Sequence, residues 1–139
     1  MDGRVRNIPQ EKWRSFWARA ESFHEGLESV RPSRDDACVS MAVHCSIAAL
    51  DALTVFFLKE RSAGQNHFEV VPLLKKMTAK DESAKKQAED SFRQLANLKM
   101  VAEYDDRNAS KTEADKAMAL CEKIYRFVES ELKSAGAFP

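Results

Sequence analysis

The feature that most constrains the fold is the three- and four-residue spacing of apolar side chains along most of the chain. In a helix this spacing places them on one face, which then has to pack against another element. Four long stretches show the spacing, at residues 13–27, 38–56, 84–102 and 114–132. Glycine and proline number only four each, which leaves few of the turns that a β-protein needs. The sequence therefore predicts an all-α fold.

The first two stretches have recognisable boundaries. Pro9 suits the first turn of a helix, and residues 30–33 should end that helix because the residue before Pro32 is disfavoured in helical geometry. The second stretch is the longest and most apolar, and many of its residues are small. Small side chains let neighbouring helices approach closely, so we expect this to be the central helix of a bundle. Gly64 would cap its C-terminus.

Two capping boxes predict where later helices begin. Asn66 with Glu69 opens a short helix, in which Pro72 marks either a kink or the true start. Ser110 with Glu113 opens the last helix. Residues 75–87 carry many charges of both signs, and we expect a solvated helical face and a loop there, with the fourth helix starting near residue 81. No segment alternates with the period of a strand, so the prediction is an antiparallel bundle of four long helices plus a short helix, in one domain spanning residues 1–139.

Charge and cysteine content limit the functional class. The 22 basic residues are balanced by 22 acidic ones, which argues against a protein that holds nucleic acid by bulk charge. Cys38, Cys45 and Cys121 are an odd number with no C-x-x-C spacing, and all three lie on apolar helical faces. We therefore interpret them as core residues of a protein in a reducing compartment.

Neither the N-terminal residues nor the longest apolar run indicates a membrane protein. Residues 1–6 lack the apolar core of a signal peptide, and the longest apolar run, residues 47–58, is broken by Asp51. We expect a cytoplasmic protein with no membrane contact.

The histidines are the first candidates for chemistry. His67 follows a loop and opens a helix, where its imidazole is either exposed and titratable or simply helps to set the loop. His24 lies on the apolar face of the first helix, and we expect it to be half-buried with its hydrogen bonds satisfied. His44 stands beside Cys45 without a second ligand at metal-binding spacing, so we expect no metal site.

Asp51 is the other candidate, because a carboxylate in the apolar central helix lies either on its outer face or in the core with a partner. Since Asp51 shares one edge with Thr54 and Leu58, we expect it to be partly exposed.

Two passages resemble the HEPN family of helical domains. Residues 48–59, which contain Asp51, followed by the segment from Asn66 to Leu74, resemble that family's central helix and the helix start with its histidine. Residues 98–106, followed by the helix from Ser110, resemble its last two helices and their junction. The resemblance covers most of residues 37–132.

Ribonucleases of that family carry an arginine, four to six residues and then a histidine at this junction. The arginine is expected to position phosphate, and the histidine to act on the 2′-hydroxyl or the leaving group. In this chain Lys99 and Tyr104 stand in these places. A lysine offers phosphate a point charge without the bidentate fork, and a phenol with an ordinary pKa of about 10 is a poor base at neutral pH. The purely structural alternative is that the Lys99 stem covers the core and Tyr104 closes the helix.

The resemblance thus implies a non-catalytic HEPN-like interaction or nucleotide-responsive module, without a cofactor, that forms a homodimer and pairs with a small nucleotidyltransferase in a toxin–antitoxin-like system. An exposed apolar stripe with Trp13, Trp17 or the last helix would be the dimer interface. The alternative is a metal-independent ribonuclease that uses His67, Lys99 and Tyr104. A helical scaffold unrelated to HEPN also stays open.

Overall fold

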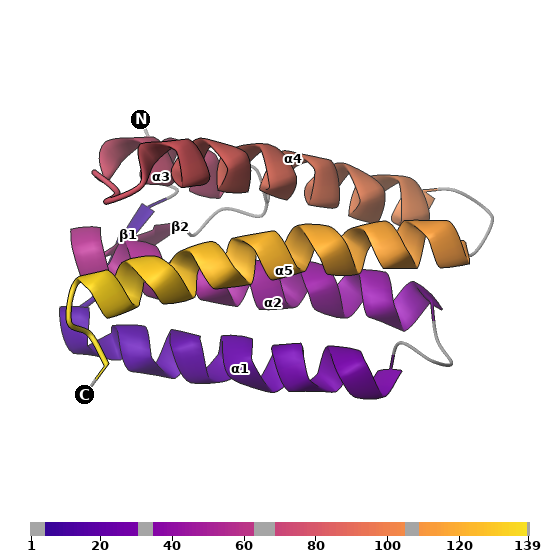
Figure 1. Cartoon of the computed structure of the whole chain (residues 1–139), viewed down its shortest axis with the longest axis horizontal. Helices are drawn as coiled ribbons and strands as arrows, with labels where there is room; N and C mark the ends of the chain where they lie inside the picture. Colours follow the sequence, from indigo (N-terminus) through magenta and orange to yellow (C-terminus); the bar gives the residue numbers. More distant parts are fainter. Residues whose placement is uncertain (1–4, 31–34, 63–68, 105–108, 139) are drawn as a thin grey trace.

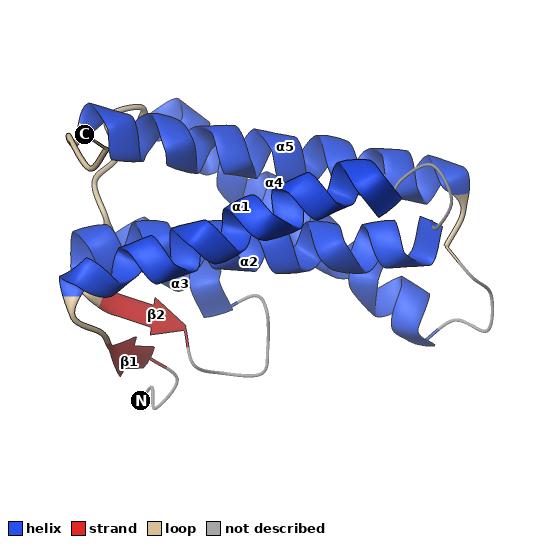
Figure 2. Cartoon of the chain, turned by 90° about the horizontal axis from the view of Figure 1, so that it is seen from below, coloured by secondary structure: helices blue, strands red, loops and turns tan. Residues whose placement is uncertain are grey.

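A computed structural model describes residues 5–30, 35–62, 69–104 and 109–138, with the backbone alone for residues 101–104. The predicted architecture is confirmed: four long helices form an antiparallel bundle, and a short helix packs at one end (Figures 1 and 2). The long helices are α1 (Trp13–Val30), α2 (Asp35–Leu58), α4 (Glu82–Tyr104) and α5 (Lys111–Ser134), and the short elements are β1 (Val5–Asn7), the 3₁₀ turn η1 (Gln10–Lys12), β2 (Glu60–Ser62) and α3 (Val70–Lys76).

Helix α2 is central, as its small residues predict. It packs against α1, α4 and α5, and it is buried on almost all sides. Ala42, Ala49 and Ala52 have no exposed surface, so the neighbouring backbones come close at these positions. All three cysteines are buried, in agreement with their interpretation as core residues.

The length and composition of α2 would also suit a membrane span, because its 24 residues include a window with a mean hydropathy of 1.8. However, 67% of that window is buried inside the fold, and the core helix of a bundle passes the same test. The helix therefore gives only weak evidence on a membrane, and the cytoplasmic assignment stays a prediction.

The end of α2 differs from the prediction. The helix stops at Leu58, and Lys59 takes the left-handed conformation, with φ of 58°. The Lys59 amide donates to the carbonyl of Val55 at 3.0 Å, which closes the helix with a single bond. Gly64 lies outside the described residues.

Two short strands were not predicted, although the fold is all-α as expected. Residues 60–62 leave the helical direction after Lys59 and form β2, which pairs antiparallel with β1. Each strand has three residues, so neither is long enough to show a period of two in the sequence.

At the start of α1, Pro9 precedes the 3₁₀ turn instead of lying in the first α-helical turn. Trp13 and Trp17 then enter the core, where each is only 6% exposed. Trp13 meets the ring of Phe56 edge-on at 5.6 Å, and Trp17 stacks on Tyr125 at 4.8 Å. The expectation that the tryptophans form an exposed interface is therefore wrong for the single chain: α1 turns its aromatic side chains towards α2 and α5.

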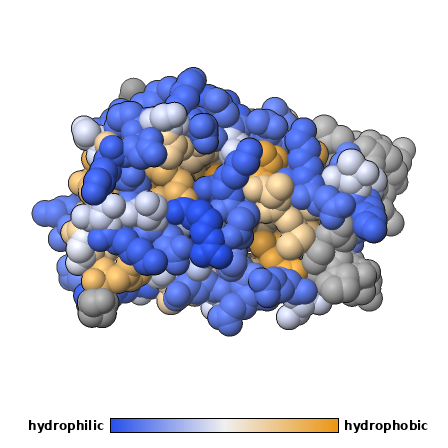
Figure 3. Space-filling model, viewed as in Figure 1, coloured by the Kyte–Doolittle hydropathy of each residue, from blue (hydrophilic) through white to orange (hydrophobic). Residues whose placement is uncertain are grey.

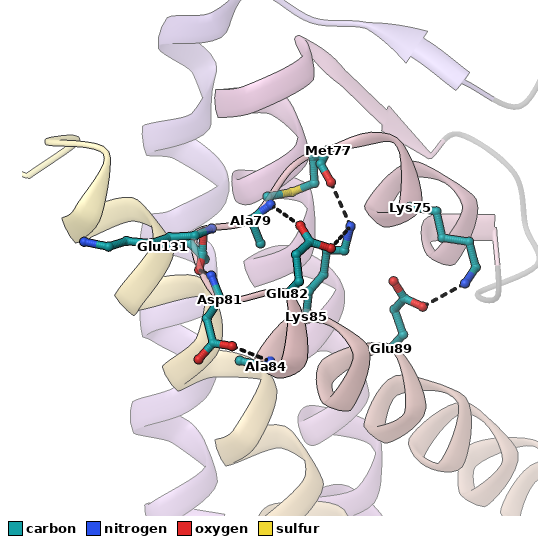
Figure 4. Close-up of polar contacts among 10 residues, drawn as sticks. Lys75, Met77, Ala79, Asp81, Glu82, Ala84, Lys85, Glu89 and Glu131 are labelled. Atoms are coloured by element: carbon teal, nitrogen blue, oxygen red, sulfur yellow. Dashed lines mark hydrogen bonds and ion pairs between the residues drawn. The ribbon is translucent and has the colours of Figure 1, made fainter.

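The charged segment at residues 75–87 is largely exposed, as predicted, and Lys85 is the exception among its charged side chains; Figure 4 shows its contacts. Lys85 is 8% exposed and donates to the carbonyl of Met77 at 2.8 Å. Glu131 of α5 is 3% exposed, and its carboxylate accepts the backbone N–H groups of Lys80 and Asp81 at 2.8 and 3.2 Å. Charged side chains here satisfy the backbone of a tight turn, which ties α5 to the start of α4.

Local sequence signals predicted the starts of α3 and α5 better than they predicted the end of α2. The capping box of α5 is confirmed: Ser110 Oγ accepts from Glu113 N at 3.1 Å, and Glu113 Oε1 accepts from Ser110 N at 2.9 Å. Helix α3 begins at Val70, so Pro72 lies in its first turn and marks a start rather than a kink. Asn66 lies outside the described residues.

Candidate functional site

Asp51 is buried with a partner, which corrects the expectation of partial exposure. Its side chain is 3% exposed, and Oδ2 lies 3.1 Å from Nη2 of Arg61, which comes from β2. The strand that follows α2 folds back over the helix, and sequence periodicity on α2 alone does not predict this cover. Burial raises the pKa of Asp51 to about 7, against the opposing attraction of Arg61 and Arg19.

The three residues proposed for a variant nuclease are only partly described. The described part of helix α4 extends to Tyr104, and because the residues that follow lie outside the described part, the prediction that Tyr104 closes the helix stays a prediction. Lys99 is half-buried in the last two turns of α4. His67 and the side chain of Tyr104 lie outside the described residues, so whether the three groups converge stays a prediction.

His24 and His44 make packing contacts with neighbouring aromatic rings. His24 is half-buried as predicted, with Nε2 2.8 Å from Glu122 Oε1 and its ring stacked on Tyr125 at 4.0 Å. His44 is exposed and stacks on Phe23. In the part of the chain that the structure describes, no three His, Cys, Asp or Glu side chains are grouped so as to hold a metal ion.

A groove between α4 and α5 is the candidate binding site near the junction. It has a volume of about 220 Å³ and is lined by Gln94, Asn97, Leu98, Glu113 and Lys116. The two carboxamides and Lys116 are exposed, whereas Leu98 is half-buried and forms an apolar surface. In the view of Figure 3, which includes the outer side of α4 and α5, apolar patches lie between mostly hydrophilic residues.

Sequence reasoning did not identify this groove. The signal that was present is the exposed face of α4, where Gln94 and Asn97 are three residues apart and therefore neighbours on the helix. That α5 brings Glu113 and Lys116 beside them depends on the register of two helices, which no local pattern reports.

Comparison with protein-family models, with curated proteins and with solved structures finds no match for this chain. The site must therefore be interpreted from its own chemistry.

Proposed function

We propose that this chain is a non-catalytic HEPN-like module that binds a nucleotide and works beside a small nucleotidyltransferase in a toxin–antitoxin-like system. The observation that supports nucleotide binding is the groove between α4 and α5, next to the junction where the HEPN resemblance is found.

The groove offers the contacts that a nucleotide needs. The carboxamides of Gln94 and Asn97 each carry a donor and an acceptor, the combination that pairs with the edge of adenine. Leu98 provides an apolar surface for the base, and Lys116 provides a positive charge for a phosphate.

The same groove is poorly equipped for catalysis. Among the described residues that line it there is no histidine, and the carboxylate of Glu113 accepts a hydrogen bond from the Ser110 amide in the capping box. The buried carboxylate of Asp51 is held by Arg61 and is closed to solvent. A general base has to reach the proton that it removes, and neither carboxylate is placed for this. Binding without cleavage is the function that these contacts favour.

Calorimetric titration of the chain with AMP and ATP tests the groove. We expect binding that Gln94→Ala and Lys116→Gln each weaken about tenfold, since each removes a hydrogen bond or a charge contact. Gln87→Ala and Lys123→Gln are matched controls, because each is exposed one heptad from its counterpart and outside the groove lining. If the controls weaken binding as much as the groove variants, the assignment of the groove is wrong.

Incubation with a mixed structured RNA pool in the absence of metal tests the non-catalytic part. We expect the RNA to remain intact with the wild type. Cleavage that is lost in both His67→Ala and Lys99→Ala would overturn the proposal in favour of the variant ribonuclease.

The homodimer is proposed through the long helices, with a new location for its interface. Among the described residues, the large apolar side chains that are exposed are Met100 on α4, at 46%, and Phe57 on α2, at 36%. Met100 lies near the helical junction, so we place the interface there rather than at the tryptophans.

A further inference from the structure

Two arginines stand directly opposite each other in the small sheet. Arg6 of β1 is the cross-strand partner of Arg61 of β2. Directly opposed residues of an antiparallel pair project to the same face, with Cβ atoms about 5 Å apart, and like charges in this position destabilise the pair. Negative charge nearby would offset this repulsion.

A third arginine approaches the same place from α1. The guanidinium carbons of Arg61 and Arg19 lie 4.8 and 5.5 Å from the centroid of the Phe16 ring. Both guanidinium groups also attract the carboxylate of Asp51. Phe16 is 8% exposed, so the ring is a fixed support between the two cations.

Among the described residues, the carboxylates near these three arginines do not balance their positive charges. Asp51 meets Arg61 through one ion-pair contact, at Nη2. Arg61 Nε is buried and has no hydrogen-bond partner among the described residues. Within the same described part of the chain, Arg6 and Arg19 make no ion pair with a carboxylate. Glu60, the acidic residue next to Arg61 in β2, projects to the opposite face of the two-stranded sheet. It forms an ion pair with Lys76 of α3 at 2.6 Å.

We propose that Arg6, Arg19 and Arg61 form a binding site for a phosphate dianion, either free or as a terminal phosphomonoester. Guanidinium groups match the oxygens of a phosphate with paired N–H donors, and a dianion would offset the excess positive charge left after Asp51. Asp51 then holds Arg61 in place while the exposed Arg6 and Arg19 reach the ligand. None of these residues lines the groove between α4 and α5, so the site stands whether or not the groove binds a nucleotide.

The test is a titration with inorganic phosphate, followed by calorimetry and by the thermal midpoint of unfolding, with chloride used to hold ionic strength constant. We expect phosphate to raise the midpoint, because a ligand that binds only the folded state stabilises it. Arg6→Gln and Arg19→Gln should each weaken phosphate binding about tenfold through the loss of a charge-assisted hydrogen bond. Both side chains are exposed, so these two variants should fold normally. Arg61→Gln is not used, because it would leave Asp51 buried without its partner.

Arg14→Gln is the matched control, since Arg14 is an exposed arginine of α1 that lies over a different ring, that of Trp13. Absence of a phosphate-dependent shift, or equal weakening by Arg14→Gln, would overturn the site. A parallel titration compares a short oligonucleotide with and without a 5′-phosphate. Tighter binding of the phosphorylated form than of both the unphosphorylated form and inorganic phosphate identifies a terminal phosphomonoester as the ligand, and binding no tighter than that of inorganic phosphate identifies the free ion.

Discussion

The pH dependence of stability is the sharpest consequence of the buried Asp51. Its pKa rises from an ordinary 3.8 in the unfolded chain to about 7 in the folded one, chiefly through burial. Between these values the folded state holds a proton that the unfolded state has released. The contribution of Asp51 to the free energy of unfolding is therefore fully present below pH 3.8 and is lost as the pH rises to about 7.

The Asp51→Asn variant carries no titrating group at this position. From pH 5 to the folded-state pKa there are about two pH units, each worth about 1.4 kcal/mol, so the loss in the wild type between pH 5 and 8 is about 3 kcal/mol. Whatever the substitution costs at pH 5, the stability of the variant relative to the wild type should improve by about this amount at pH 8.

Urea unfolding at pH 5, 6, 7 and 8, followed by circular dichroism at 222 nm, measures this difference. Asp90→Asn is the control, because the Asp90 side chain is 52% exposed and its contact with Arg93 is a surface pair of small energetic value. A relative stability of Asp51→Asn that stays constant across this range would refute the argument from burial.

Three further predictions concern stability and assembly. Ser110→Ala should lower the free energy of unfolding by about 1 kcal/mol in a urea titration, since it removes the cap of α5, whereas Ser130→Ala on the exposed face of that helix should change it little. Glu131→Ala should cost about 3 kcal/mol by the same measurement, because two backbone amides lose a charged acceptor, and a cost below 1 kcal/mol would show that the turn does not depend on it. In sedimentation equilibrium we expect a dimer that Met100→Ser dissociates and Phe57→Ser leaves intact, and a wild-type monomer would contradict the proposed homodimer.

The parts of the fold that sequence reasoning predicted correctly depend on near neighbours in the chain. The Ser110–Glu113 capping box needs only two residues three positions apart, and both of its hydrogen bonds are present. The periodicity of α1 and α5 likewise predicts the helices themselves, because an apolar stripe reflects the geometry of a single helix.

The errors concern positions whose surroundings come from distant segments. Helix α2 is apolar on nearly all sides, so its periodicity could not show that Asp51 faces the returning strand β2. Lys85 has the sequence context of a solvated lysine, yet its ammonium group donates a hydrogen bond to the carbonyl of Met77 inside the α3–α4 turn. In each case a polar side chain is buried because a partner from elsewhere satisfies it, and such a partner leaves no local signal.

The same division applies to the candidate sites. The sequence by itself determined that the chain forms four long helices, whereas the correspondence of Lys99 and Tyr104 to the arginine and histidine of HEPN ribonucleases is a resemblance and stays a prediction. Only the tertiary structure decided that α5 lies beside Gln94 and Asn97 to form a groove, and that β1 pairs with β2 so that Arg6 opposes Arg61. Helix formation is governed by contacts within a few residues, whereas a site is defined by the register between segments, which the packing of the whole core sets.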